Sequence, residues 1–193
     1  MIRIGIVGGI GSGKSYVSKS FGFPIFNADL EVAKLYKKDK TIFIKLKKVL
    51  PKFFNSFPVK KKEVTDAILA NNSNLRKIIK IIHSSIKKKL HHFLKVNKTK
   101  KAVILDIPLL LENKINKKKD ILIFVQSKKS IVNKKLQKRK GYNKKLLKKF
   151  KNIQLSLDYK KKKSQFIIVN DFTKKTVKKY VKDILGEILK WKK

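Results

Sequence analysis

The chain has 193 residues, of which 52 are lysine or arginine and 12 are aspartate or glutamate, so its formal net charge is +40. A chain of this length can bury enough apolar surface for one α/β domain with a small insertion. The sequence holds no cysteine, which excludes disulfides and thiolate metal sites and fits a reducing compartment. We therefore expect a cytoplasmic protein.

Lysine carries almost all of the positive charge, because arginine occurs only at positions 3, 76 and 139. The lysines are scattered through every segment. Nucleic-acid-binding modules usually gather basic residues on one face and interleave arginine and aromatic side chains for base contact. We expect no specific nucleic-acid partner, but a surface that attracts polyanionic small molecules and adheres weakly to nucleic acid at low salt.

The first apolar run, residues 2–7, is β-branched and leads directly into glycines, after which residues 14–21 have helical spacing. A signal peptide has a longer apolar core, and a membrane-spanning helix needs about 20 apolar residues. We interpret the run as a buried strand followed by a loop and a helix, and we expect no membrane partner.

Further strands and helices alternate along the rest of the chain. Buried strands are predicted at 24–26, 102–106, 121–126 and 165–170, and helices at 29–37, 128–140 and about 177–188. Gly141 is a plausible end signal for the helix before it. Alternation of this kind predicts a three-layer α/β fold in which helices cover both faces of a parallel sheet.

Residues 41–98 show apolar residues only at helical spacing, which indicates an inserted helical subdomain. The lysine-rich stretch 140–164 is expected to form a helical lid. The core of this single domain is expected at about 1–40, 100–140 and 165–193. Four aromatic residues are expected to pack and not to stack on bases: Phe53, Phe54, Phe57 and Trp191.

The strongest motif is Gly8-Gly9-Ile10-Gly11-Ser12-Gly13-Lys14-Ser15, a complete phosphate-binding loop between a strand and a helix. Glycines let backbone N–H groups converge on phosphate oxygens, and the helix N-terminus adds partial positive charge. Lys14 is expected to reach the β- and γ-phosphates of ATP, and the Ser15 hydroxyl to bind Mg²⁺. The candidate nucleotide-binding residues are Gly9, Ile10, Gly11, Ser12, Gly13, Lys14, Ser15 and Tyr16.

Asp29 follows the second predicted strand, and the carboxyl ends of parallel strands face one ligand crevice. A carboxylate at this place can accept or orient the proton of an attacking hydroxyl. We interpret Asp29 as a catalytic residue. An N-cap of the following helix is the alternative, and the two roles are compatible.

Two further charged residues are candidates for phosphoryl transfer. Asp106 ends a strand, where a carboxylate can hold Mg²⁺ directly or through water. The alternative is that Asp106 is a cap or turn residue before Pro108. Arg139 lies next to the predicted lid, which could bring its guanidinium to the transferring phosphoryl, or it is an ordinary surface arginine. The three histidines have no partner at metal-ligand spacing, so a metal site there is not expected.

Together with Asn27-Ala28-Asp29 and the run from Asp106 to Asn113, the loop gives the chain a resemblance to the dephospho-coenzyme A kinases. This family resembles the nucleoside monophosphate kinases in fold. Near the end of their sequences, members of the family have a glutamine, a lysine and an asparagine at set spacings. Gln154, Lys160 and Asn170 match these positions. The resemblance implies phosphorylation of the ribose 3′-hydroxyl of dephospho-CoA by ATP, the last step of coenzyme A biosynthesis.

The resemblance also assigns roles to single residues. It implies that Asp29 is the base for the ribose hydroxyl, that Asn170 lies near the adenine, and that Lys135 and Arg139 are the lid-side basic positions. Residues 41–98 are similar to the family's acceptor-binding subdomain, and His83 matches a family histidine.

The chain departs from the family pattern at several places. Ser84 follows His83 where proline is usual, the span from Ser15 to Asp29 is shorter, Asn27 replaces a common aspartate, and Asp171 stands near a usual glycine.

Two rival functions remain open from the sequence. One is a nucleoside or nucleotide kinase on the same scaffold, and the other is a basic nucleic-acid-binding protein that uses ATP only as a regulator. For either kinase we expect ATP and Mg²⁺ as cofactors and a monomer or small homo-oligomer.

Overall fold

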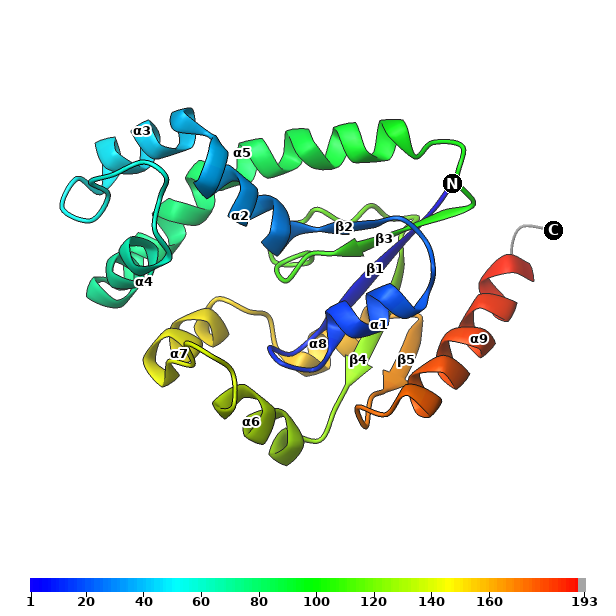
Figure 1. The fold of residues 1–193 in the computed structure, drawn as a ribbon. Coiled ribbons are helices and arrows are strands. Elements are labelled where there is room, and N and C mark those ends of the chain that lie inside the picture. Colours follow the sequence, from blue (N-terminus) through cyan, green and yellow to red (C-terminus); the bar gives the residue numbers. More distant parts are fainter. Residues whose placement is uncertain (191–193) are drawn as a thin grey trace. The chain divides into compact units, whose positions relative to one another are not determined.

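Figure 1 shows the fold as given by a computed structural model, which describes residues 1–190. Five parallel strands form one sheet in the order β2-β3-β1-β4-β5. They are β1 (Ile2–Gly8), β2 (Ile25–Asn27), β3 (Ala102–Asp106), β4 (Ile121–Gln126) and β5 (Phe166–Val169). The predicted parallel sheet is confirmed.

The two strands that flank β1 are apolar almost throughout. All five residues of β3 and the first five of β4 are buried, as expected for strands covered on both faces. Two strands differ from the prediction at both ends. Strand β2 begins and ends one residue later than 24–26, and β5 is one residue shorter at each end than 165–170. Gln165 and Asn170, which flank β5, still bond to β4 through their backbone N–H groups.

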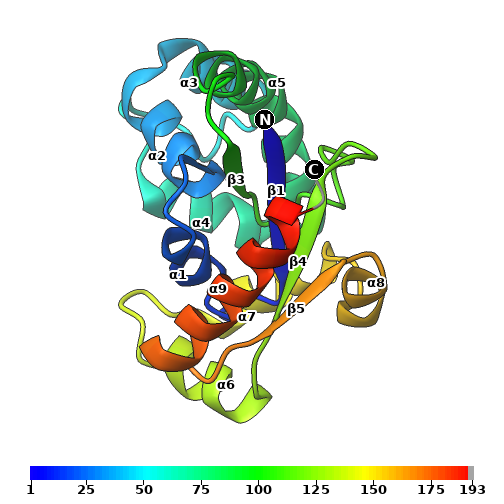
Figure 2. The ribbon, with the colours of Figure 1, turned by 90° about the vertical axis from the view of Figure 1, so that its right-hand side faces the viewer.

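Helices α1 (Lys14–Ser20) and α9 (Lys174–Lys190) lie together on one side of the sheet (Figure 2). Val17 and Phe21, at the end of α1, meet the apolar face of α9 in a single core against the strands. Buried members from α9 are Val177, Val181, Ile184 and Ile188. Their spacing of three and four residues is the period of a helix with one apolar face, so the sequence pattern predicted this core.

The other side of the sheet is covered by α8 (Leu157–Lys162) and by the segment after β3. A Cβ on Gly5 in β1 would lie 2.6 Å from a methyl of Leu110 and 2.8 Å from a methyl of Leu122. Glycine at this position therefore lets the loop after β3 pack directly onto the strand.

The chain divides into two compact units, and the sheet with its covering segments is the first: residues 1–27, 96–142 and 154–193. Residues 28–95 and 143–153 form the second unit. It contains α2 (Ala28–Lys38), α3 (Lys40–Val49), α4 (Lys61–Ala70), most of α5 (Asn72–Val96) and α7 (Lys144–Asn152). The region 41–98 that we expected to be helical falls almost wholly in this unit, and within it no strand is present among the described residues.

Buried contacts hold the second unit together. The side-chain amide of Asn74 donates to Ala67 O at 2.8 Å, and the ammonium of Lys149 in α7 donates to Leu69 O at 3.1 Å. Phe54 is fully buried, as expected, whereas Trp191 lies outside the described residues. Burial raises the pKa of the Tyr36 hydroxyl well above its usual range.

Helix α6 (Lys129–Gln137) ends earlier than the prediction of 140. The N–H of Lys138 bonds to the carbonyls of both Lys134 and Leu136, and the N–H of Arg139 bonds to Leu136 O. This tightening of the last turn ends the helix, and Gly141, with φ 76°, lies in the turn beyond it.

Within residues 1–190, no helix is both long and apolar enough to cross a bilayer.

Candidate active site

The loop between β1 and α1 ends at Gly13, in a left-handed backbone conformation that only glycine adopts easily. Gly13 is the N-cap of α1 with φ 90° and ψ 18°, and its carbonyl accepts the N–H groups of Tyr16 and Val17. The first amides of a helix have no partner within it, and they carry the positive end of the helix dipole. The turn at Gly13 therefore presents a set of donors that suits an anion.

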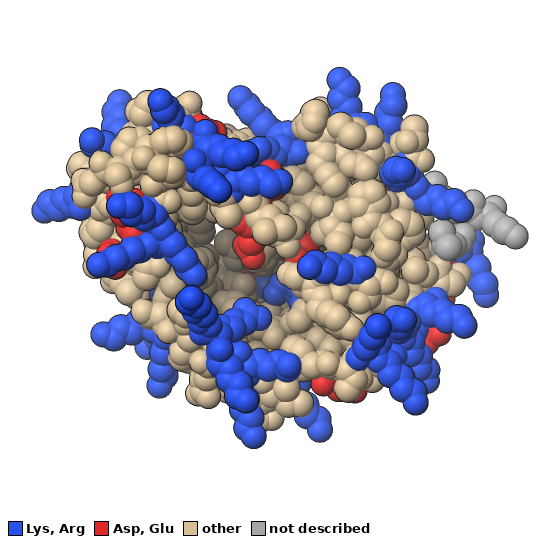
Figure 3. Space-filling model, in the orientation of Figure 1, with Lys and Arg blue, Asp and Glu red and all other residues tan. Residues whose placement is uncertain are grey.

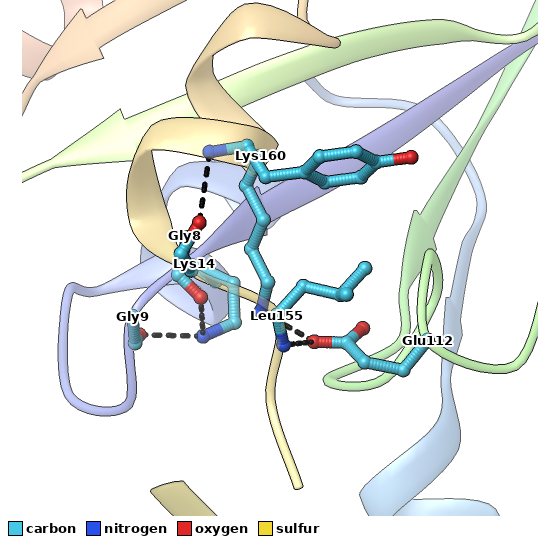
Figure 4. A network of polar contacts seen from close by, with 8 residues as sticks. Gly8, Gly9, Lys14, Glu112, Leu155 and Lys160 are labelled. Carbon is cyan, nitrogen blue, oxygen red and sulfur yellow. Dashed lines mark hydrogen bonds and ion pairs between the residues drawn. The ribbon is translucent and has the colours of Figure 1, made fainter. Parts of the chain in front are cut away.

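Lys14 folds back over this loop (Figure 4). Its ammonium donates to Gly9 O at 2.8 Å and to Gly8 O at 3.3 Å. Ser15 and Tyr16 follow on the exposed side of α1. The sequence-predicted loop residues Gly8 to Tyr16 thus lie together at the carboxyl end of β1, with a cation held at the loop.

Two close approaches explain the glycines at the centre of the loop. A Cβ on Gly11 would lie 2.9 Å from Cγ of Leu136 and 3.0 Å from a methyl of Val132, both in α6. A Cβ on Gly13 would lie 2.2 Å from Nδ2 of Asn170. Since φ is also positive at both glycines, a side chain at either position would strain the backbone and collide with the neighbouring element.

Residues from β4 and β5 hold the middle of the loop. The carbonyl of Ser12 accepts the amide Nδ2 of Asn170 at 2.8 Å and the hydroxyl of Ser127 at 3.0 Å. Asn170 directly follows β5, and Ser127 directly follows β4. Sequence reasoning missed Ser127, although a hydroxyl residue immediately after a buried parallel strand is the available signal.

Asn170 is 1% exposed, and both polar atoms of its side chain form hydrogen bonds with the backbone. Besides the bond to Ser12, its Oδ1 accepts the N–H of Phe172 at 2.9 Å. This bond accompanies a left-handed backbone at Phe172, with φ 68°. The ammonium of Lys135 lies 4.7 Å from the centre of the Phe172 ring, a cation–π distance. The adenine contact that the resemblance implies for Asn170 stays a prediction.

Asp106 is the last residue of β3 and is 3% exposed. One of its oxygens, Oδ2, accepts Nδ2 of Asn27 at 2.7 Å, and the two residues are register partners across β2 and β3. The turn alternative therefore does not account for this carboxylate, because Asp106 belongs to strand β3 and precedes the turn at Pro108.

Oxygen donors at Asp106 and Ser15 are of the type that Mg²⁺ prefers, and Mg²⁺ usually binds one or two carboxylates or hydroxyls together with substrate phosphates and water. No group of three or more His, Cys, Asp or Glu is placed to hold a metal within residues 1–190.

Asp29 is the second residue of α2, two residues beyond the end of β2. The N-cap alternative is wrong, because α2 begins at Ala28 directly after the strand. In the first turn of a helix a carboxylate is still favoured by the helix dipole. Asp29 belongs to the second compact unit, whereas the phosphate loop belongs to the first.

Arg139 lies in the exposed turn after α6, two residues beyond its last residue, and not within a helix. Its carbonyl accepts the N–H of Tyr142. Lys135 lies in α6 itself, so the two basic positions are separated by the end of that helix.

A buried ion pair in the first unit joins α8 to the segment after β3 (Figure 4). Nζ of Lys160 is 2.7 Å from Oε1 of Glu112, and their side chains are 2% and 9% exposed. The sequence comparison with the family included both positions, but no role was predicted for either.

Lysine covers much of the face drawn in Figure 3, and acidic groups are few and dispersed on it. Basic side chains occur over all parts of this face.

The residues 2–176 match the family model described as dephospho-CoA kinase. The chain belongs to the dephospho-CoA kinase family. Among curated relatives, the dephospho-CoA kinase of Wolbachia pipientis wMel is 33% identical over 96% of this chain and 97% of its own length. That of Fusobacterium nucleatum is 32% identical over 87% of this chain and 89% of its own.

Solved structures show the same fold at low sequence identity. TT1252 from Thermus thermophilus has a TM-score of 0.75 at 20% identity and covers 96% of this chain and 97% of its own. A dephospho-CoA kinase from Campylobacter jejuni has a TM-score of 0.62 over 96% of each chain, also at 20% identity. A shikimate kinase from Bacteroides thetaiotaomicron has a TM-score of 0.51 at 14% identity over 98% of each chain, so it shares the fold of this chain.

Proposed function

We propose that this chain transfers the γ-phosphoryl group of ATP to the ribose 3′-hydroxyl of 3′-dephospho-CoA, which gives CoA and ADP in the last step of coenzyme A biosynthesis. Membership of the dephospho-CoA kinase family supports the choice of substrates. The observation that carries the proposal is the complete phosphate loop from Gly8 to Ser15, held in shape by Asn170 and Ser127.

The loop binds the phosphate chain of ATP through its backbone amides. Lys14, whose ammonium donates to two loop carbonyls, would turn to the β- and γ-phosphate oxygens of ATP, which are stronger acceptors because they are charged. Its fixed charge then stabilises the negative charge that spreads over the γ-phosphoryl oxygens in the transition state.

Asp29 is the proposed base. The 3′-hydroxyl oxygen attacks the γ-phosphorus, the bond to the bridging β–γ oxygen breaks, ADP leaves, and the hydroxyl proton passes to the Asp29 carboxylate. Support comes from its position just beyond β2, because ligands bind beyond the carboxyl ends of the strands in sheets of this type.

Ser15 and Asp106 would hold Mg²⁺. The ion supplies neutralisation of the β- and γ-phosphate charge when it is bound with ATP. The side-chain amide of Asn27 donates to Oδ2 of the Asp106 carboxylate at 2.7 Å. That bond fixes the direction in which the remaining acceptor positions of the carboxylate point.

Arg139 and Lys135 are proposed to contact the phosphates or the nucleotide when the lid closes. Of the stretch 140–164 predicted as a lid, we assign only the part around α7 to the lid, because α8 packs on β1. We assign the acceptor subdomain to residues 41–98, in line with their helical structure. The enzyme would work in the cytoplasm as a monomer or small homo-oligomer.

The test is an ADP-release assay with Mg·ATP that compares dephospho-CoA, adenosine, AMP, dCMP and no acceptor. Mass spectrometry and nuclease P1-type 3′-phosphatase digestion of the product would locate the new phosphate. Lys14→Met is the inactive control, because it keeps the chain length and removes the charge.

Each outcome has a distinct meaning. ADP release that depends on dephospho-CoA and yields a 3′-phosphate supports the proposal. Release that depends on another acceptor would replace the substrate and favour a nucleoside or nucleotide kinase. No release with any acceptor would contradict an enzymatic role and favour a basic nucleic-acid-binding protein.

A further inference from the structure

Lys160 is a lysine buried in the first unit. It is 1% exposed, although its three lysine neighbours at 161–163 are all exposed. A lysine ammonium is buried at such a cost in hydration that it normally requires a charged partner. Glu112 is that partner, at 2.7 Å.

Glu112 holds the segment that contains Lys160 at two points. Its Oε1 accepts the ammonium of Lys160 and also the backbone N–H of Leu155 at 3.1 Å. Leu155 is the second residue after the chain returns from the second unit, which ends at Ile153. One carboxylate oxygen therefore fixes both the start of this segment and the middle of α8.

The segment so fixed lies beside the phosphate loop. Two methyls of Leu157 lie 3.5 Å and 3.8 Å from the position that a Cβ on Gly9 would occupy. The carbonyl of Gly9 in turn accepts the ammonium of Lys14. Glu112 thus holds the segment that contains α8, this segment places Leu157 beside Gly9, and the carbonyl of Gly9 accepts the ammonium of Lys14. Figure 4 shows the contacts of Glu112 and those of Lys14.

The pair is poorly arranged for stability alone. The second oxygen of Glu112, Oε2, is buried and has no hydrogen-bond partner among the described residues. Buried ion pairs with incomplete hydrogen bonding are often no more stable than apolar side chains of the same volume. Retaining two buried charges at this place is better explained by the position that they impose on their neighbours.

We propose that Glu112 and Lys160 are positioning residues for phosphoryl transfer, which hold α8 against the phosphate loop and so fix the geometry of Gly9 and Lys14. This inference deepens the proposed function and rests on it for the identity of the reaction. It does not require either residue to touch a substrate.

The experiment compares Lys160→Met, Lys160→Arg and Glu112→Gln with Lys161→Met, a matched control that removes an exposed neighbouring charge. For each variant we would measure the dissociation constant of Mg·ADP by calorimetry, kcat and KM with dephospho-CoA, and the Tm. All binding and kinetic measurements are made well below the Tm of the least stable variant.

We expect Lys160→Met and Glu112→Gln to weaken Mg·ADP binding and lower kcat by about 10- to 100-fold, since small misplacements at a reacting centre have effects of this size. The KM for dephospho-CoA should change less. Lys160→Arg should restore most of the loss, because it keeps the charge that Glu112 faces, and Lys161→Met should resemble the wild type.

If Lys160→Met and Glu112→Gln lower only the Tm and leave nucleotide binding and kcat unchanged, the pair is structural and the inference is wrong. Should Lys160→Met fail to fold, Glu112→Gln decides, because glutamine keeps an oxygen for Leu155 N–H and removes only the charge. Weakened Mg·ADP binding in a chain that does not phosphorylate dephospho-CoA would contradict the proposed function and leave this inference standing.

Discussion

The side chain of Asn170 donates to the carbonyl of Ser12 at 2.8 Å and so joins two residues that lie 158 positions apart in the sequence. The same amide uses its oxygen to accept the N–H of Phe172. One buried side chain therefore fixes both the phosphate loop and the start of the segment that leads to α9.

Asn170→Ala should weaken Mg·ADP binding about 10-fold, because the Ser12 carbonyl loses one of its two donors and Phe172 N–H loses its acceptor. Leaving buried polar groups unpaired costs about 1–3 kcal/mol. Calorimetric titration with Mg·ADP measures the effect. Asn133→Ala, on the exposed face of α6, is the control, and equal affinities in the two variants would contradict the supporting role of Asn170.

Gly13→Ala should abolish nucleotide binding, since its Cβ would meet Asn170 at 2.2 Å and φ is 90°. Gly186→Ala is the matched change within α9, where no atom lies within 4 Å of the new Cβ. There, alanine should stabilise the protein by about 0.5–1 kcal/mol, because glycine loses more backbone entropy in a helix. Thermal unfolding and ADP titration of both variants check the two expectations.

Asp29→Asn should lower kcat about 100-fold or more and leave KM for ATP and the Tm nearly unchanged, because a positioned general base contributes about 10²–10⁴-fold to rate. Steady-state kinetics with dephospho-CoA measure this loss. Asp66→Asn removes an exposed carboxylate from α4 in the same unit and should have no effect. Full activity of Asp29→Asn would exclude Asp29 as the base.

Binding to nucleic acid should be weak, insensitive to sequence and lost as salt rises. The reason is that a net charge of +40 releases counterions from any polyanion, with a steep dependence on salt concentration. Fluorescence anisotropy with labelled DNA and RNA at 50 and 300 mM KCl would measure this. Binding that persists at the higher salt and prefers one sequence would instead support the nucleic-acid-binding alternative.

Asp171 should contribute fully to stability above its usual pKa of 3.8 and progressively less below that pH. The N–H of Thr173 and the hydroxyl of Thr176 donate to its carboxylate and hold its pKa below the usual value of 3.8. A lowered pKa favours the folded state while the group is ionised, and this contribution is lost as pH falls through the pKa of the folded state.

Urea unfolding of Asp171→Asn and wild type between pH 3 and 6 tests this dependence. The variant should be the less stable protein at pH 6, and the difference should shrink as pH approaches 3. A difference that grows on acidification would have the wrong sign.

Much of the fold follows from local sequence. The run of β-branched residues before Gly8, the glycines, and Lys14 and Ser15 predict a strand, a phosphate loop and a helix, because backbone conformation and dipole effects act within a few residues. The buried strands 102–106 and 121–126 were also predicted with their observed bounds. The predicted ends of elements were wrong where a tight turn or a bond to a neighbouring strand sets the boundary, as after Gln137 and beside Gln165.

Only the tertiary structure decided which polar residues support the loop. Ser127 and Asn170 meet at Ser12 because the sheet order places β4 and β5 on one side of β1, and no local pattern fixes that order. Lys160 is likewise the first of four consecutive lysines, and periodicity cannot tell which of them is buried. The choice depends on Glu112, 48 residues earlier by number, because a charge leaves water only where the folded chain brings an opposite charge to meet it.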